Sequence, residues 1–312
     1  MQSLIDAFRV LVITPSSQLT ASKQVSEGAK TDLINPLPDE ILYDFFSRLD
    51  LATLAGCCLV SKKWSVLAGD SGLWKAVIYR ELAFGKDKFA KYYGDIGEEP
   101  ILRHDIRDVL KDTHHEMLEH HKRLAIESGL SPEEVQEVRI PPIQKLFKLV
   151  VLPKTLDGKQ FDAEMFEEYV KNPKNSIHKT CYAYFSPEAK EALRKALPQE
   201  SSWALVPRDV LEGSGAQEWP EQQRLVVPLS GFEVIKGLAA IVGNFTEYVE
   251  TGKCLYGQKP LTLTYTRCQE VVRIGQRDYQ LVVGGFAPAG LDVNFRHDFD
   301  SGGIGVAALR KL

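Results

Sequence analysis

The sequence predicts an α+β fold, in which three short N-terminal helices precede a mixed helical region and a C-terminal antiparallel β-rich domain. The first observation is that apolar residues recur at helical spacing from Ile41 to about Phe84. The second is that the C-terminal part holds short β-rich runs, which are separated by glycine-containing turns. These runs are Leu261–Arg267, Tyr279–Val283 and Gly305–Leu309.

The composition is that of an ordinary globular protein, since 44% of the 312 residues are hydrophobic and 26% are charged. The net charge of -4 and the lack of a basic block predict no nucleic-acid partner and no membrane-surface partner. No run approaches the roughly 18 apolar residues of a membrane-spanning helix. The apolar residues before Thr14 lack the basic region of a signal peptide, so we expect a cytoplasmic protein.

The first predicted domain is a flexible leader, residues 1–32, because residues 14–32 are small and polar.

The second predicted domain comprises residues 33–84. Pro38 suits the first turn of a helix, and Leu37 can pack against that turn from outside. The following helix has an apolar band wider than one core contact needs, formed by Ile41, Leu42, Phe45, Phe46 and Leu49. Asp50 is the expected cap of the second helix, and Asp70 or Ser71 that of the third.

A unit of about fifty residues with surplus apolar surface is typical of a module that completes its core on another protein. Four segments stand in order: Leu37-Pro38-Asp39-Glu40-Ile41-Leu42, a central Leu54, Leu59-Val60-Ser61-Lys62-Lys63-Trp64 and a closing Leu73-Trp74. Together they resemble the F-box, the module by which substrate adaptors attach to Skp-cullin ubiquitin ligases. Ser61 departs from the pattern, because many F-boxes have cysteine there.

The resemblance implies that this unit binds a Skp-type adaptor and, through it, a cullin ligase. The residues expected to contact the adaptor are Leu37, Pro38, Ile41, Leu42, Leu54, Val60 and Trp64. Those expected in the internal core are Phe46, Leu49, Leu67 and Trp74. The alternative is an ordinary helical subdomain, whose tryptophans belong to its own core and which makes no contact with a ligase.

Residues 85–139 are predicted to be a helical connector. Five of the seven histidines lie here, at His104, His114, His115, His120 and His121. The zinc-protease pattern needs a second histidine four residues after His115, and Glu119 stands there instead. We therefore expect a solvated helical face and no metal. Ser131-Pro132-Glu133-Glu134 is a capping box that predicts the start of a further short helix.

Residues 140–312 are predicted to be an α+β client-recognition domain with no bound cofactor. They resemble an uncharacterised module of predicted proteins from chlamydia-like intracellular bacteria, in which F-box proteins also occur. The segments that carry this resemblance are Trp203–Leu211 with Gln222-Gln223, Tyr265–Cys268, Val282–Leu291 and Gly305–Ala308. The resemblance implies an effector that a bacterium secretes into the cytosol of a eukaryotic host.

An enzyme is the alternative from another class. The five cysteines, Cys57, Cys58, Cys181, Cys254 and Cys268, have neither disulfide nor zinc spacing, which indicates a reducing compartment. Cys254 or Cys268 with His178 or His297 would supply the thiol and base of a cysteine-dependent hydrolase. No family signature surrounds either cysteine, so the predicted set of catalytic residues is empty. The glycine-rich Gly284–Gly290 and the acidic Asp292, Asp298 and Asp300 are expected to be turns, without phosphate or calcium.

Overall fold

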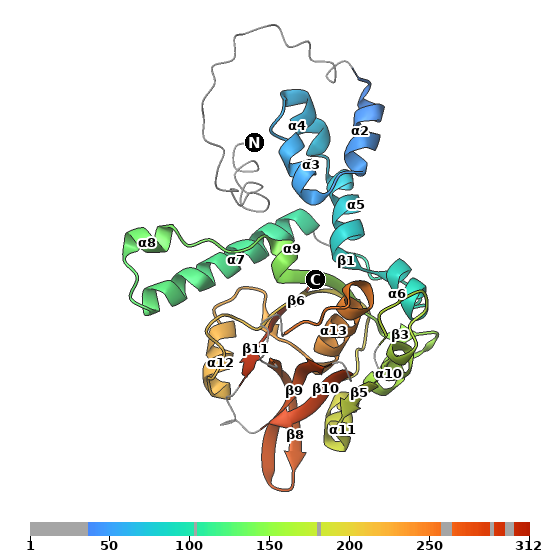
Figure 1. Ribbon diagram of the computed structural model, residues 1–312, viewed down its shortest axis with the longest axis vertical. Helices are drawn as coiled ribbons and strands as arrows, with labels where there is room; N and C mark the ends of the chain where they lie inside the picture. The colour runs from blue at the N-terminus through green and yellow to red at the C-terminus, as the bar shows by residue number, and fades with distance from the viewer. Residues whose placement is uncertain (1–36, 103–104, 180–181, 257–263, 288–289, 297–302) are drawn as a thin grey trace. The chain divides into compact units, whose positions relative to one another are not determined.

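The computed structural model describes residues 37–102, 105–179, 182–256, 264–287, 290–296 and 303–312 (Figure 1). The chain divides into two compact units. Unit 1 comprises residues up to Leu82 together with Asp105–His114 and Pro141–Ile143. Unit 2 comprises Ala83–His104, His115–Ile140 and Gln144–Leu312. The predicted leader and its boundary at residue 32 lie outside the described residues.

Unit 1 is helical, and between residues 37 and 82 the structure describes four helices where the sequence predicted three. They are α2 (Asp39–Ser47), α3 (Leu51–Cys57), α4 (Lys62–Ala68) and α5 (Ser71–Leu82). The predicted second helix is split because the Ser61 hydroxyl accepts a hydrogen bond from the Trp64 amide and so begins a new helix. Asp50 caps α3 through the Thr53 amide, as predicted.

The core of unit 1 is aromatic, with the rings of Phe46 and Trp64 edge to face at 5.1 Å between centroids. Trp74 is also buried, and its indole N–H donates to the Ala68 carbonyl at 2.6 Å. Arg80 on α5 donates to the carbonyls of Ser47, the last residue of α2, and of Leu49, two residues beyond it. These bonds satisfy carbonyls that the helix itself leaves unpaired, and they fix α2 on α5.

Unit 2 is built on two five-stranded sheets. The first has the order β1 (Ala83–Phe84), β2 (Phe147–Leu152), β6 (Ser202–Pro207), β12 (Ala308–Lys311) and β7 (Glu233–Val234). The second has the order β11 (Ile304–Val306), β8 (Tyr265–Ile274), β9 (Arg277–Ala287), β10 (Gly290–Arg296) and β5 (Tyr182–Phe185). A two-stranded ribbon joins β3 (Thr155–Leu156) and β4 (Lys159–Gln160).

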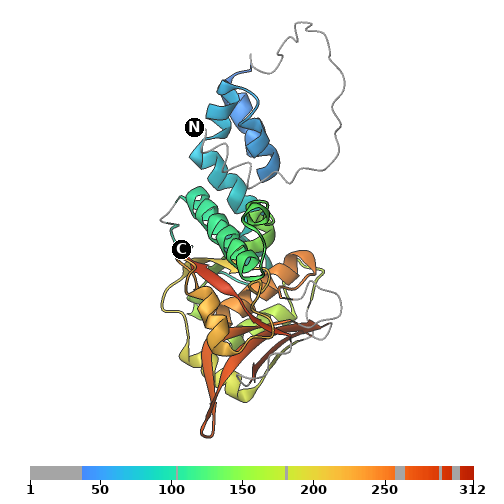
Figure 2. The same cartoon turned by 90° about the vertical axis from the view of Figure 1, so that its left-hand side faces the viewer.

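The C-terminal strands are mainly antiparallel, as predicted, and the hairpin of β8 and β9 extends from unit 2 in Figures 1 and 2. Two details differ from the prediction. The edge strands β5 and β11 pair in parallel with their neighbours. The last predicted run, Gly305–Leu309, is divided at Ala307, because β11 belongs to the second sheet and β12 to the first.

Four helices of unit 2 contact strands of these sheets, and a further one, described below, is buried. The four are α6 (Lys86–Tyr92), α10 (Ala163–Lys171), α11 (Pro187–Lys195) and α12 (Trp219–Val226), and α8 (Pro132–Gln136) is a short helix of the same unit. Helix α7 (Ile106–Glu127) has its first residues in unit 1, and α9 (Ile143–Leu146) begins there too. Ser131 forms the predicted capping box of α8 with Glu134. No helix in the described part of the chain is both long and apolar enough to cross a membrane.

Helix α13 (Gly237–Thr251) is the buried one, and it packs on strands of both sheets. Nearly all of its residues up to Val249 are buried, and its apolar side chains lie on more than one face, as is typical of a core helix. Gly243 allows its close approach to β6, since a Cβ atom there would lie 2.6 Å from a methyl carbon of Val206. A side chain at this position would force the helix and the sheet apart.

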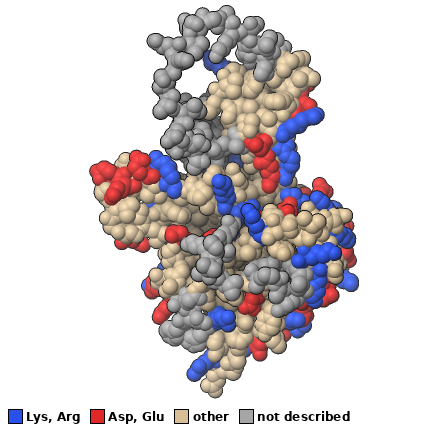
Figure 3. Space-filling view, viewed as in Figure 1, with Lys and Arg blue, Asp and Glu red and all other residues tan. Residues whose placement is uncertain are grey.

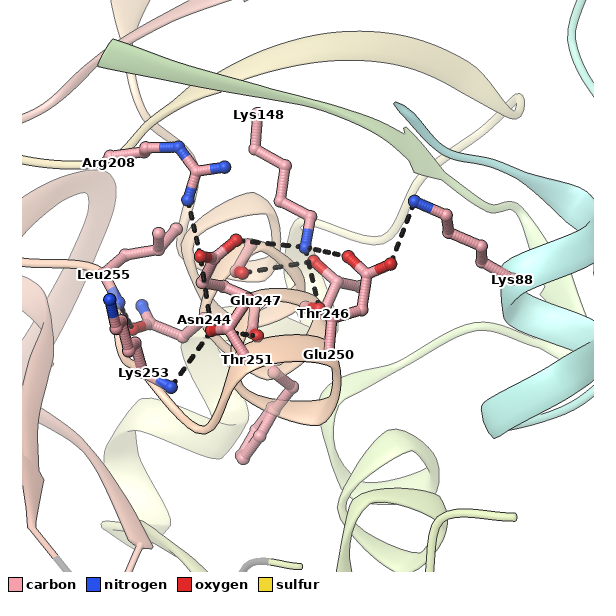
Figure 4. Close-up of polar contacts among 12 residues, drawn as sticks. Lys88, Lys148, Arg208, Asn244, Thr246, Glu247, Glu250, Thr251, Lys253 and Leu255 are labelled. Carbon is pink, nitrogen blue, oxygen red and sulfur yellow. Dashed lines mark hydrogen bonds and ion pairs between the residues drawn. The ribbon is translucent and has the colours of Figure 1, made fainter. Parts of the chain in front are cut away.

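A buried cluster of charges holds the C-terminal half of α13 to β2 (Figure 4). Lys148 on β2 is 1% exposed, and its ammonium group donates to Glu247 at 3.2 Å and to Glu250 at 2.8 Å. Arg208 pairs with Glu247 at 2.6 Å, and Lys88 pairs with Glu250 at 2.9 Å. Burial raises the pKa of both carboxyl groups, but these cations outweigh it and hold each pKa below its usual value. We call these five residues the Lys148 cluster.

Candidate functional site

The seven residues predicted to contact an adaptor fall into two groups. Leu42, Leu54 and Trp64 lie in the interior of unit 1. Leu37, Pro38, Ile41 and Val60 are exposed, Ile41 by 54% and Val60 by 62%. Of the residues expected in the core, Phe46 and Trp74 are buried, while Leu49 and Leu67 are half-buried.

The exposed apolar residues of α2 form a stripe along one side of the helix. Ile41 and Phe45 are four residues apart, so their side chains are neighbours on the helix surface. Leu37 lies before the non-helical N-cap Pro38, just outside the helix, and is also exposed. We call Leu37, Ile41 and Phe45 the α2 stripe. Phe45 was missing from the predicted contacts, although its spacing from Ile41 signals the same face.

A second exposed apolar segment is the turn between α3 and α4, which carries Leu59 and Val60. Lys63 follows this turn, and its ammonium group donates to the Leu37 carbonyl at 2.8 Å and pairs with Asp39 at 3.0 Å. These bonds place the start of α4 beside the start of α2. In Figure 3 the described part of unit 1 shows mostly uncharged atoms, with its charged side chains towards the edge.

Apolar side chains as exposed as these gain no free energy of burial when unit 1 folds, because other residues fill its core. Leu42 and Phe46 on α2 already supply that core, and both are fully buried. The α2 stripe and the α3–α4 turn therefore have the properties of a surface that a partner covers. Their apolar chemistry suits protein docking, and neither segment brings together the groups that proton transfer or metal binding requires.

The thiol groups considered for catalysis are not activated. Cys268 is fully buried, and burial raises its pKa well above the usual value. Burial also raises the pKa of Cys254. Both thiols are thus held in the neutral form, whereas a nucleophilic cysteine needs a lowered pKa. The His178 ring packs against Tyr248, with 6.1 Å between centroids, and His297 lies outside the described residues.

The acidic residues considered for calcium are only partly described. Asp298 and Asp300 lie outside the described residues. Asp292 accepts a hydrogen bond from the Tyr265 hydroxyl at 3.0 Å. Within the described ranges, no group of three or more His, Cys, Asp or Glu side chains is placed to hold a metal ion.

The histidines of α7 do not all lie on the solvated face that the sequence predicted. His114 and His120 are buried, whereas His115 is exposed. The reason for His120 is a tertiary contact, since its Nε2 lies 3.0 Å from the Glu212 carbonyl oxygen, to which it donates. A residue 92 positions away supplies this acceptor, so local spacing gives no sign of it.

We expect unit 2 to lose stability as the pH falls below about 6.5, the pKa of an unfolded-chain histidine. Burial, the largest influence, lowers the pKa of folded His120, so on acidification the unfolded chain binds a proton that the folded chain does not. One such proton contributes a slope of up to about 1.4 kcal/mol per pH unit. Denaturant unfolding of the wild-type protein and of His120→Gln between about pH 7 and pH 5 measures the slope of the unfolding free energy against pH. Equal slopes in the two proteins would contradict the assignment.

In a comparison with protein families, a model described as F-box-like matches residues 34–80. The described part of this match is α2, α3, α4 and most of α5, so an F-box-like domain carries the α2 stripe and the α3–α4 turn. F-box domains are generally non-catalytic and bind Skp-type proteins of cullin ligases. No curated protein and no solved structure matches the chain. The resemblance of residues 140–312 to a bacterial module thus receives no support.

Proposed function

We propose that this protein is an F-box adaptor, which docks on a Skp-type protein of a cullin ubiquitin ligase and presents a client for ubiquitination. The observation that carries the proposal is the exposed α2 stripe on an F-box-like domain whose own core is complete. An apolar side chain as exposed as Ile41 gains free energy of burial only when a partner covers it. The predicted partner surface is the α2 stripe with Pro38 and the α3–α4 turn.

The three buried residues of the predicted contact set have a supporting role in this proposal. Leu42, Leu54 and Trp64 fix the positions of α2, α3 and α4, and hence the spacing of the exposed side chains. Helices that present a preformed surface avoid the entropy cost of ordering it during binding. A change at Leu54 would therefore weaken docking through the fold of unit 1.

Unit 2 is the proposed client-binding part, within predicted boundaries of residues 140–312 and with residues 85–139 as the connector. The client is a protein whose identity the sequence does not give. Docking would act by proximity, because holding a client beside a charged ubiquitin-conjugating enzyme raises its effective concentration. Ubiquitination of the client would take place in the cytoplasm of a eukaryotic cell, where cullin ligases operate. No contact in the described residues favours a hydrolase.

The experiment that tests docking is capture by a purified Skp-type adaptor. We expect Leu37→Ala with Pro38→Ala to reduce capture several-fold, because the exposed Leu37 side chain is lost from the predicted contact. The matched control is Val227→Ala, which removes an 82% exposed apolar side chain from unit 2. Circular dichroism verifies that both variants fold. Unchanged capture by a folded double variant would refute the docking surface.

A further inference from the structure

The turn from α7 to α8 belongs to unit 2 and presents a further exposed apolar surface. Ile126 is 61% exposed there, and Leu130 is 40% exposed. We call residues 125–139 the α7–α8 tip. We propose that the α7–α8 tip binds a basic, amphipathic segment of a partner protein. This binding is independent of adaptor docking, and the inference rests on the proposed function only where it identifies the partner as the client.

Helix α7 is anchored on the rest of unit 2 as far as Leu124. The His120 ring contacts the Glu212 carbonyl oxygen at 3.0 Å. Leu124 packs against Gly213, where an added Cβ atom would lie 3.0 Å from one of the leucine methyl carbons. Beyond this contact no residue of the α7–α8 tip is buried, although α8 carries the apolar Val135. The fold of unit 2 therefore leaves the apolar side chains of the tip uncovered.

The α7–α8 tip has a defined conformation although it lies outside the core. Helix α7 ends in a Schellman motif, in which the Leu130 amide donates to the Ala125 carbonyl at 3.0 Å and the Gly129 amide to the Ile126 carbonyl at 2.9 Å. These bonds place Leu130 beside the last turn of α7, which carries Ile126. Ser131 follows directly and begins α8 with its capping box. A surface that is ordered in advance loses less entropy when a partner binds.

The charge of the α7–α8 tip indicates which partner it suits. Residues 125–139 hold four glutamates and one arginine, a net charge of -3 in a chain whose total is -4. Figure 3 shows acidic side chains gathered over α8. Arg139 pairs with Glu137 at 3.8 Å, and the exposed Glu127 and Glu133 extend the negative surface. Apolar side chains surrounded by carboxylates complement a segment that combines apolar residues with lysine or arginine.

The same charge disfavours the other possible occupants of the tip. A second copy would bring two negative surfaces together, and like charges oppose such a contact. Anionic lipid headgroups and nucleic-acid phosphates would be repelled in the same way. A partner that is basic but wholly polar would leave Ile126 and Leu130 without apolar atoms to pack on. A basic amphipathic protein segment meets both requirements.

The test uses full-length proteins and a labelled peptide that repeats Leu-Lys-Lys-Leu, whose leucines share one face of a helix. One control peptide has glutamate in place of lysine, and the other has serine in place of leucine. Two variants change the α7–α8 tip. Ile126→Ser with Leu130→Ser removes its apolar side chains, and Glu133→Lys with Glu137→Lys reverses its charge.

Each tip variant has a matched control elsewhere in unit 2. Ile177→Ser with Val227→Ser removes two apolar side chains that are 90% and 82% exposed. Glu188→Lys with Glu191→Lys reverses two exposed charges on α11. Circular dichroism verifies that all four variants fold.

Fluorescence anisotropy measures the affinity for each peptide, and hydrogen exchange locates the contact. We expect the wild-type protein to bind the Leu-Lys peptide saturably and more tightly than either control peptide. Both tip variants should bind it about tenfold more weakly, because each removes one component of the contact, while both control variants keep the wild-type affinity. Addition of the peptide should slow exchange within residues 125–139.

The outcomes separate this inference from the proposed function. Equal affinities of the tip variants and their controls would overturn the inference, and so would protection confined to other residues. Equal binding of the serine-containing peptide would reveal a contact by charge alone, which also overturns it. Tip protection that increases with protein concentration in the absence of peptide would identify a second copy as the occupant and overturn it too. The expected peptide binding, combined with no binding of a Skp-type adaptor, would uphold the α7–α8 tip and refute adaptor docking.

Discussion

Replacing Lys148 with methionine is expected to lower the free energy of unfolding of unit 2 by about 3–5 kcal/mol. Lys148 is the central cation of the Lys148 cluster, and its side chain is 2% exposed. The substitution leaves Glu247 and Glu250 close together in a buried site, each with one remaining cation. Breaking a buried ion pair costs more than the pair contributes, because the remaining charges stay desolvated.

The measurement is denaturant unfolding, with hydrogen exchange across α13 to report on unit 2. The matched control is Lys195→Met, since Lys195 pairs with Glu191 at 3.2 Å and its side chain is 73% exposed. An exposed pair of this kind contributes less than about 1 kcal/mol. If Lys148→Met costs no more than Lys195→Met, the Lys148 cluster does not hold α13 in place.

Replacing Ile41 with glutamate is expected to weaken binding of a Skp-type adaptor by at least about 100-fold, or roughly 2.8 kcal/mol. Ile41 lies in the middle of the α2 stripe and is 54% exposed in the free chain. In the proposed complex its replacement would bury a carboxylate among apolar side chains with no cation to pair it. Unit 1 itself should keep its stability, because the new charge remains in water in the free protein.

The control for this prediction is Val227→Glu, which introduces the same charge at an exposed position of unit 2. Thermal unfolding of both variants shows whether unit 1 is intact, and affinity for the adaptor is measured only on folded protein. Similar affinities for Ile41→Glu and Val227→Glu would show that the α2 stripe lies outside the adaptor contact.

Much of unit 1 was predictable because its signals are local. Asp50 caps α3 as expected, and the wide apolar band of α2 does have two surfaces, one in the core and one exposed. The division of that band was not predictable residue by residue. Leu42 and Ile41 are adjacent and equally apolar, and only the packing of α4 and α5 decides that Leu42 is buried while Ile41 is exposed.

Unit 2 shows what local patterns do not reveal. Lys148 lies in a run that the sequence shows to be apolar and basic, but its partners Glu247 and Glu250 are about a hundred residues away. The parallel pairing of β5 with β10 also joins distant segments. Spacing predicts which face of an element is apolar, whereas these contacts depend on which elements the complete fold brings together.

The central claim is that unit 1 binds a Skp-type adaptor, and calorimetric titration of the full-length protein with a purified adaptor tests it most directly. The account predicts a saturable one-to-one complex, with a negative heat-capacity change from the burial of the α2 stripe. It also predicts that this signal disappears in Ile41→Glu at the same concentrations. The absence of binding by the folded wild-type protein would contradict the account and leave an F-box-like domain without ligase contact.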